Sequence, residues 1–455
     1  MKQLGRQGVS PSKKAVTKTI DMKKAYRNKL KRTPKSLTLA GACLGIVVGG
    51  TAVHVSAADD SSMSDMEKQN QALQDRLTAL EDLVKKEGLM PSGDPPKKMV
   101  SAMSDMTISG FVQTSYFYNT QHPASGLSDT YLWNTTDNSF SLNKLKLTVA
   151  GAPVATDKWD ATYRASLMFG DDAADLNSPS SKNGTTISDP SMQNVREAYV
   201  EMNVPIGTGL DIKAGELISL LNWESGDGGA ANPNFSQGYQ WWYTGNGPSA
   251  GIQATYNFTD KFAATVRVDN GLYQGPTDNN QGKAFSGSLN FKPTDKWWFN
   301  IVGWTDDQPA GSSTSGIETI GGYQFTDKLG TGYEVDYFHF GAPTSTTDLW
   351  SVGGWAWYNF TSKVGAAFRA DFLSQDHGVM GPAVRPGAGL YGAGLTGPVW
   401  TDGSYLGSLT ATLNLTPAPN IKIQPEIRYN YTGYYGGLNG DVAAFIIGCG
   451  ATYLF

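Results

Sequence analysis

Residues 159–169 read Trp-Asp-Ala-Thr-Tyr-Arg-Ala-Ser-Leu-Met-Phe, and apolar and polar side chains alternate through this stretch. In an extended chain Trp159 and Tyr163 lie on one face, and Asp160 and Arg164 lie on the other. Charged side chains on the hidden face of a soluble sandwich would be costly without partners. On the inner wall of a water-filled barrel they stay hydrated while the apolar face meets lipid. The stretch therefore predicts a membrane-spanning strand.

The same alternation recurs in 364–372 and 421–430, and no helix-length amphipathic pattern occurs between Thr107 and Phe455. Gly accounts for 53 of 455 residues, aromatic residues for 11% and charged residues for 17%. Average usage is about 7% Gly and about 25% charged, so the composition excludes an ordinary cytosolic enzyme. It suits strands with one lipid face and one wet face.

A repeated turn sequence sets the strand count. Tyr-Asn-Phe-Thr-Asp-Lys at 256–261 returns in related form at 291–296, 323–328 and 358–363, every 32 to 35 positions. Thr and Asp favour tight turns because their side chains bond nearby main-chain N–H groups. Segments at 156–158, 205–209 and 416–420 occupy equivalent places, which makes seven short turns. With one strand at each end, we expect an all-β, transmembrane antiparallel β-barrel of about 16 strands, with 14 or 18 as the alternatives.

The expected strands lie between these turns and the longer Gly-, Asn-, Ser- and Pro-rich loops. Their ranges are 107–118, 138–150, 159–169, 193–204, 209–220, 248–258, 262–270, 282–292, 296–305, 316–325, 329–339, 349–360, 363–373, 404–415, 420–431 and 441–455.

Alternation along these strands places many charged residues on the inner wall, as candidates to line a pore. The main candidates are Lys144, Lys146, Arg164, Glu197, Glu201, Lys213, Arg267, Asp269, Glu334, Asp336, Arg369, Asp371, Glu426 and Arg428, with Asp160, Asp211 and Lys422 beside them. The two signs nearly balance, so neither anion nor cation preference follows.

A sixteen-stranded barrel is wide, and a segment folded inward must narrow it if the channel is to discriminate. Residues 221–247 are among the longest connections and contain Glu224 and Asp227. We expect these acids to face basic wall residues such as Arg164 or Arg369 across a constriction. The alternative is a surface loop with hydrated acids.

The N-terminal residues precede the barrel in two further parts. Residues 1–58 combine a long basic stretch with an apolar run that ends in small residues, which predicts a signal peptide cleaved after Ala57 or Ala58, or else an uncleaved anchor. Residues 59–106 contain a predicted short α-helical coiled coil and a Pro-rich linker in the periplasm. The coiled-coil core residues are Met63, Met66, Asn70, Leu73, Leu77, Leu80 and Val84. We expect a homotrimer held partly by this segment, and a solvated linker helix is the alternative.

The last strand ends on Tyr453 and Phe455, which share its outer face. An aromatic carboxy terminus with Tyr two positions before it resembles the signal read by the bacterial barrel-assembly machinery. The sequence therefore predicts insertion into outer-membrane lipid.

Several short stretches resemble the OmpL-like beta-barrel porin family. They are Ile108–Tyr116, Val195–Glu201, Gly209–Gly215, Asn232–Ser236 and Asp269–Gly271. The resemblance implies a bacterial outer-membrane porin that lets small hydrophilic solutes diffuse passively. Where the family pattern has Lys after the glycine at 215, this chain has Glu216.

No residue pattern indicates an enzyme. The four histidines show no metal-ligand spacing, and no glycine-rich phosphate loop is present, so we expect no cofactor or metal. Twelve of the 36 Lys and Arg lie within residues 1–35, so the exported part is acidic and binding to nucleic acid is not expected. The alternative to a porin is a surface-exposed adhesin or a structural outer-membrane barrel.

Overall fold

The computed structural model describes residues 106–128, 134–178, 181–182, 185–188, 192–245, 247–278, 280–308, 312–342, 345–376 and 404–455. All of them belong to one compact unit, Ala52–Phe455. The predicted signal peptide and the predicted coiled coil, with Met66, Asn70, Leu73, Leu77, Leu80 and Val84, lie outside the described residues.

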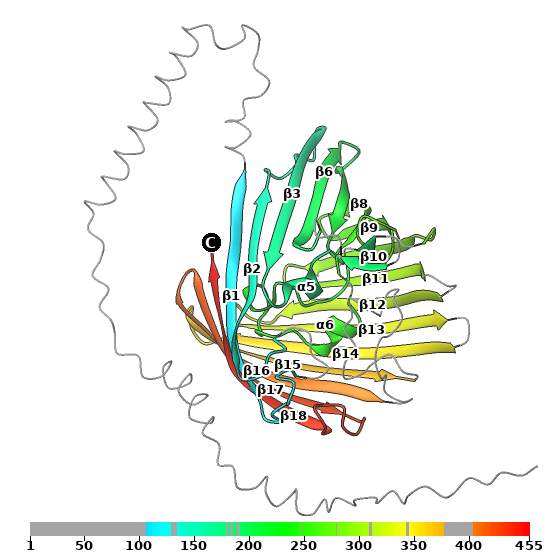
Figure 1. Ribbon diagram of the computed structural model, residues 1–455. Helices are drawn as coiled ribbons and strands as arrows, with labels where there is room; N and C mark the ends of the chain where they lie inside the picture. Colours follow the sequence, from blue (N-terminus) through cyan, green and yellow to red (C-terminus); the bar gives the residue numbers. More distant parts are fainter. Residues whose placement is uncertain are drawn as a thin grey trace, which may run out of the picture. The chain divides into compact units, whose positions relative to one another are not determined.

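Sixteen antiparallel strands close into one barrel, in which chain neighbours pair and β1 pairs with β18 (Figure 1). The predicted all-β antiparallel barrel and its count of about 16 strands are confirmed. The barrel strands are β1 (Thr107–Asn119), β2 (Ser139–Ala150), β3 (Asp160–Phe169), β6 (Val195–Val204), β7 (Leu210–Leu217), β8 (Ser249–Thr259), β9 (Phe262–Asp269), β10 (Ala284–Thr294), β11 (Trp297–Gln308), β12 (Ser312–Gln324), β13 (Leu329–Ala342), β14 (Ser345–Asn359), β15 (Val364–Gln375), β16 (Tyr405–Ala418), β17 (Ile421–Thr432) and β18 (Ala443–Leu454).

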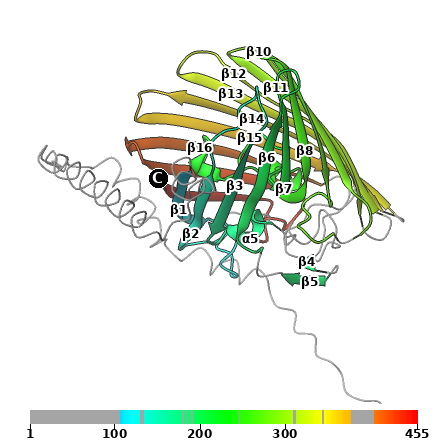
Figure 2. The same ribbon diagram turned by 90° about the horizontal axis from the view of Figure 1, so that it is seen from above.

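Short elements lie in the connections. Strands β4 (Ser181–Lys182) and β5 (Thr185–Ser188) form a separate two-stranded sheet, seen apart from the barrel strands in Figure 2. The helices are α5 (Ala173–Leu176), η1 (Gly228–Ala230) and α6 (Tyr239–Tyr243). In the described part of the chain, no helix has the length and apolar character needed to cross a membrane.

The repeated turns are built around one threonine each. The hydroxyl oxygens of Thr259, Thr294, Thr326 and Thr361 each accept hydrogen bonds from the main-chain N–H groups two and three residues later, at 3.0–3.3 Å. This is the local side-chain bonding that the sequence repeat predicts. The threonines therefore reverse the chain at four equivalent places along the barrel rim.

The C-terminal residue takes part in closing the barrel. The main-chain N–H and C=O of Phe455 hydrogen-bond Gly110 of β1 at 3.0 and 2.9 Å. Gly110 leaves room for the Phe455 ring, because a Cβ at this glycine would meet the ring and the carbonyl oxygen of Lys146. The side chains of Tyr453 and Phe455 are exposed. The predicted assembly signal thus lies on the outside of the closing strand pair.

Apolar side chains cover the outside of the strands, as expected for a surface that meets lipid. On β3, Tyr163 and Phe169 are exposed, whereas Ser166 and Met168 between them are buried. Rings also gather beside the short turns, where Phe258, Phe262, Phe291 and Phe299 stack in series with centroids 4.7–5.1 Å apart. Such an aromatic row is typical of a membrane–water interface.

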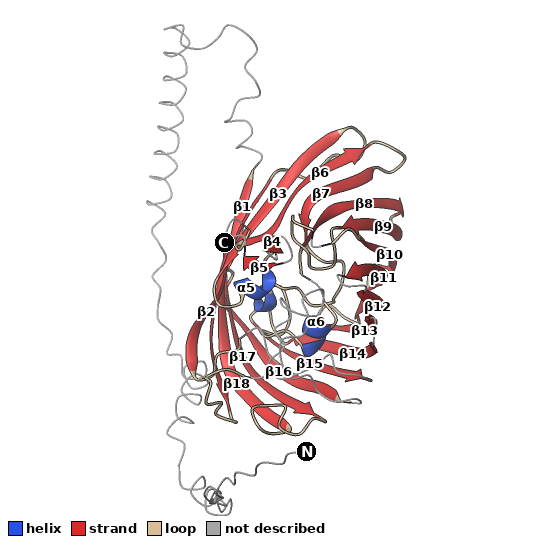
Figure 3. Ribbon diagram, turned by 45° about the vertical axis from the view of Figure 1, so that its right-hand side comes forward, coloured by secondary structure: helices blue, strands red, loops and turns tan. Residues whose placement is uncertain are grey.

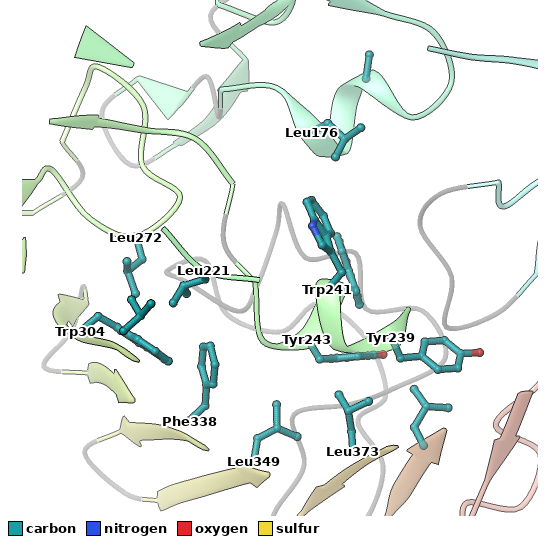
Figure 4. Close-up of a cluster of buried hydrophobic side chains, with 14 of the residues drawn as sticks. Leu176, Leu221, Tyr239, Trp241, Tyr243, Leu272, Trp304, Phe338, Leu349 and Leu373 are labelled. Atoms are coloured by element: carbon teal, nitrogen blue, oxygen red, sulfur yellow. The ribbon is translucent and has the colours of Figure 1, made fainter. Parts of the chain in front are cut away.

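The main hydrophobic cluster lies inside the barrel. Figure 4 shows Tyr243 of α6 beside wall side chains that include Leu349 and Leu373, whereas Trp241 points toward Leu176 of α5. An open aqueous barrel would have no such core, so inserted segments must fill part of the interior.

Candidate functional site

The connection 221–247 between β7 and β8 enters the barrel, and Figure 3 shows α6 within the ring of strands. Its residues hydrogen-bond wall side chains on β2, β12, β13, β15 and β17. These strands lie far apart around the barrel, so the segment must cross the interior. Of the two arrangements that the sequence left open, the contacts therefore support the inserted one. We call residues 221–247 the inserted segment.

Acidic wall residues hold the main chain of the inserted segment. The N–H of Asn222 donates to Glu318 at 2.9 Å, and that of Trp223 donates to Glu334 at 2.7 Å. Further along, the N–H of Phe235 donates to Glu426 at 2.8 Å, and that of Tyr239 donates to Asp371 at 2.6 Å. Hydrogen bonds from main-chain N–H groups to ionised carboxylates are stronger than neutral ones. Four wall carboxylates, Glu318, Glu334, Glu426 and Asp371, therefore anchor the segment by its backbone.

Basic wall residues hold its carbonyl groups. Arg428 donates to the carbonyl oxygen of Gln237 at 2.7 Å, and its guanidinium lies 4.5 Å from the centre of the Tyr239 ring. Lys422 donates to the carbonyl oxygens of Gly229 and Asn232, both at 2.8 Å. Wall side chains therefore bond both the N–H groups and the carbonyl groups of the segment.

Glu224 forms the most buried ion pair of the inserted segment. Its Oε1 lies 2.9 Å from Nη1 of Arg369, and both side chains are almost fully buried. The Trp355 indole N–H donates to the same oxygen at 3.1 Å, and the Gly238 N–H donates to Oε2 at 2.6 Å. Arg369 also donates to the Ser236 carbonyl oxygen. Glu224 thus links its own part of the inserted segment, and the part at Gly238, to Arg369 and Trp355 on the wall.

Asp227 pairs with a different part of the barrel wall. Its carboxylate lies 2.8 Å from Nζ of Lys146 on β2 and remains partly exposed. Beside it, Nζ of Lys144 lies 3.2 Å from Asp172, just before α5. Burial raises the pKa of Asp172 above its ordinary value, although Lys144 and the Asn134 N–H favour the charged form.

Part of the inner wall is left accessible by the inserted segment. Arg164 on β3 is 39% exposed and pairs with Glu197 at 2.7 Å. Lys213 on β7 is 26% exposed and lies 3.5 Å from Glu201 and 3.8 Å from Asp211. We call Arg164, Glu201, Asp211 and Lys213 the accessible sector. Charged side chains and solvent meet in this sector.

The other predicted pore-lining residues are buried by the inserted segment, by neighbouring loops or by one another. They are Lys144, Lys146, Glu197, Arg267, Asp269, Glu334, Asp336, Arg369, Asp371, Glu426 and Arg428. Arg267 shows a second kind of partner, since it pairs with Asp269 at 2.8 Å and donates to the Ile218 carbonyl oxygen at the end of β7. Their direct contact with solutes stays a prediction.

Sequence reasoning missed Glu318 of β12, which is fully buried against the inserted segment. The apolar residues beside it do not mark one face of the strand, because Ile317 is exposed on the outside whereas Ile320 is buried. It also missed Gln240 of α6, which contacts Asp336 at 2.7 Å. No sequence signal pairs Gln240 with a strand almost a hundred residues away.

Among the described residues, Glu318, Glu334 and Asp336 form the one group of carboxylates close enough to share a metal ion. The described histidines do not join it. Most of the other charged groups described in the interior form ion pairs or contacts with peptide groups, as Glu224 and Lys422 do, which suits holding a segment and ordering water.

Comparison with known proteins supports the fold. The structure is similar to the anion-selective porin from Comamonas acidovorans, with a TM-score of 0.50, 10% identity, and coverage of 77% of this chain and 99% of that chain. It is also similar to the outer membrane channel DcaP of Acinetobacter baumannii, with a TM-score of 0.49, 12% identity, and coverage of 77% and 97%. At such identities the likeness concerns the fold alone. No curated protein matches the chain.

The sequence model of one family matches residues 105–455, which is the whole barrel and most of the chain. That family is described as "Putative beta-barrel porin-2, OmpL-like". The resemblance drawn from short motifs is confirmed, and with it an outer-membrane porin-type barrel. The chain belongs to this OmpL-like family of outer-membrane beta-barrel porins.

Proposed function

We propose that the protein is a channel through which small hydrophilic solutes diffuse passively across the outer membrane. The observation that carries the proposal is the unequal covering of the inner wall. The inserted segment is bonded to β12–β17, whereas charged side chains of β3, β6 and β7 stay accessible. A passage along this side would be narrow and lined by charges of both signs, a surface that favours hydrated solutes over apolar ones.

The accessible sector would set the ion preference of such a passage. Arg164 and Lys213 would oppose Glu201, Asp211 and the partly exposed Asp227. Because Arg164 pairs with Glu197 at 2.7 Å, and Lys213 lies 3.5 Å from Glu201 and 3.8 Å from Asp211, their fields largely cancel at long range. We therefore expect weak ion selectivity and no catalytic role.

The assembly and location of the channel follow from the sequence. Residues 1–58 would export the chain, and the exposed Phe455 would present it to the barrel-assembly machinery. The predicted coiled coil of 59–106 supports a homotrimer with its helices in the periplasm. The outer membrane protein OmpT of Vibrio cholerae, which has a similar fold, has a trimer form, and this is a property of that protein.

Reversal potentials in planar bilayers test the proposal. The folded protein should give stepwise current increments, and liposomes that contain it should swell in small sugars. The charge-reversal pair Arg164→Glu with Lys213→Glu should shift the reversal potential toward cation preference. Lys292→Glu is the matched control, because Lys292 is exposed beside a short turn.

Absence of current increments from folded, reconstituted protein would contradict the proposal and favour the alternative of an adhesin or structural barrel. If the Arg164/Lys213 variant gives current increments with an unchanged reversal potential, the protein is a channel, but its passage does not run along the accessible sector.

A further inference from the structure

Three acidic side chains meet beneath the inserted segment. Glu318 of β12 and Asp336 of β13 are directly paired across the two strands, and Glu334 lies two residues from Asp336 on the same face. All three are buried, with exposures of 0–1%. One oxygen from each lies within 4.8 Å of the others. We call Glu318, Glu334 and Asp336 the acidic cluster.

The acidic cluster has no cationic partner among the described residues. Its hydrogen-bond donors are neutral groups: the N–H groups of Asn222 and Trp223, the side-chain amides of Asn222 and Gln240, and the hydroxyls of Thr244 and Ser351. By contrast, the buried carboxylates of Glu224 and Asp269 pair with Arg369 and Arg267, respectively. Burying three carboxylates together without positive charge is strongly unfavourable.

Gln240 has an amide oxygen without a hydrogen-bond partner beside the acidic cluster. Its side chain is fully buried, and its amide lies 2.7 Å from Asp336 Oδ2 and 3.2 Å from the Glu334 carbonyl oxygen. The Oε1 atom of the same amide has no hydrogen-bond partner, and neither has Oδ1 of Asp336. A half-turn of the amide exchanges its oxygen and nitrogen, which have nearly the same shape. Turned in this way, the amide gives up its hydrogen bonds to Asp336, to the Glu334 carbonyl oxygen and to Ser351 Oγ, and Oε1 faces the acidic cluster. That arrangement is repulsive alone and favourable around a cation.

We propose that the acidic cluster, together with the Gln240 amide oxygen, binds a Ca²⁺ ion. Carboxylate, amide and carbonyl oxygens are the ligands that this ion prefers, at about 2.3–2.6 Å. Two oxygens on opposite sides of such an ion are separated by about 4.8 Å, the spread that the cluster has. Mg²⁺ fits less well, because it requires near-octahedral geometry at about 2.0–2.1 Å and keeps most of its water.

The ion would fasten both ends of the inserted segment at one point. Asn222 and Trp223 begin the segment, Gln240 and Thr244 are near its end, and all four contact the acidic cluster. Ca²⁺ binding would therefore stabilise the segment's position against β12 and β13. This binding can be measured whether or not the barrel conducts.

The test uses the full-length folded protein in detergent, stripped of divalent ions with a chelator. Calorimetric titration with Ca²⁺ should show one saturable site, and saturation should raise the thermal unfolding midpoint by at least about 2 °C. Mg²⁺ should bind more weakly. Tb³⁺ is a second probe, because Trp223 is bonded to Glu334 and can sensitise its emission, which Ca²⁺ should then quench by competition.

Glu318→Gln and Asp336→Asn should each weaken Ca²⁺ binding roughly 100-fold, and Gln240→Leu by roughly 10-fold. Glu426→Gln is the matched control, since Glu426 is also buried and also bonds the inserted segment but lies outside the cluster. It should bind Ca²⁺ like the unaltered chain. Gln240→Leu keeps the test decisive if the carboxylate variants fail to fold. No Ca²⁺ binding by the unaltered protein, or equal binding by Glu318→Gln or Gln240→Leu, would overturn the proposal.

Discussion

Removing the Glu224 carboxylate should release part of the inserted segment while the barrel stays closed. Glu224→Ala leaves Arg369 buried without its nearest anion, and breaking a buried ion pair in this way costs about 3–5 kcal/mol. Asp371 lies 3.8 Å from Arg369 Nε and compensates in part, so we take about 3 kcal/mol. Since 1.4 kcal/mol corresponds to a factor of ten, the displaced form should become about 100-fold more populated.

Chymotrypsin measures this displacement directly. The inserted segment contains no Lys or Arg, but its Phe235, Tyr239 and Tyr243 are fully buried in the closed form. When cleavage is slow relative to closing, the rate follows the population of the open form, so it should rise by about 100-fold. Single-channel recordings should show larger or noisier current steps.

Two further variants make the experiment decisive. Glu224→Ala combined with Arg369→Ala removes both charges and should restore part of the loss, which a double-mutant cycle reports. Asp295→Ala breaks an exposed ion pair with Lys292 and should change neither readout. If Glu224→Ala is cleaved at the original rate in a folded barrel, the pair does not hold the segment and the reasoning is wrong.

Other predictions address the inserted segment, the closure of β1 against β18 and the predicted N-terminal coiled coil. Deleting 225–239 should raise single-channel conductance, and unchanged conductance in a folded barrel would place the constriction elsewhere. Phe455→Asp should block assembly, seen as loss of the heat-modifiable folded form from the outer membrane, because a charge would replace an exposed lipid-facing ring. Gly110→Val should impair closure of β1 against β18 in the same assay, since its Cβ would collide with a strand carbonyl. A peptide of 62–87 should associate as a parallel trimer, and Asn70→Leu should raise its melting temperature while loosening the choice of oligomer; a monomeric, unfolded peptide at high micromolar concentration would refute the coiled coil.

The fold could be predicted because its signals are local. Most strands alternate with a period of two, and each repeated turn contains the threonine that bonds its own backbone, as at Thr326 and Thr361. Strand ends therefore agree within a few residues. The inward direction of Arg369 and Arg428 also followed from alternation.

The environment of the same residues could not be predicted, because it depends on contacts between distant parts of the chain. Alternation shows that Arg369 points inward, but its burial depends on where residues 221–247 settle. Alternation failed for Glu318, which lies in a Gly- and Thr-rich strand with little contrast between its faces. Gln240 lies in one turn of helix that only the tertiary structure brings to β13.

The docking of the inserted segment through its backbone has a consequence for how this protein can diversify. Wall side chains bond peptide N–H groups at Asn222, Trp223, Phe235 and Tyr239, so many side chains could be exchanged there without losing these bonds. Proline is the exception, because it has no N–H to donate. A library that randomises the segment but spares these N–H groups and the Glu224 side chain, which pairs with Arg369, should keep its path through the barrel, while the chemistry it presents to a passing solute changes.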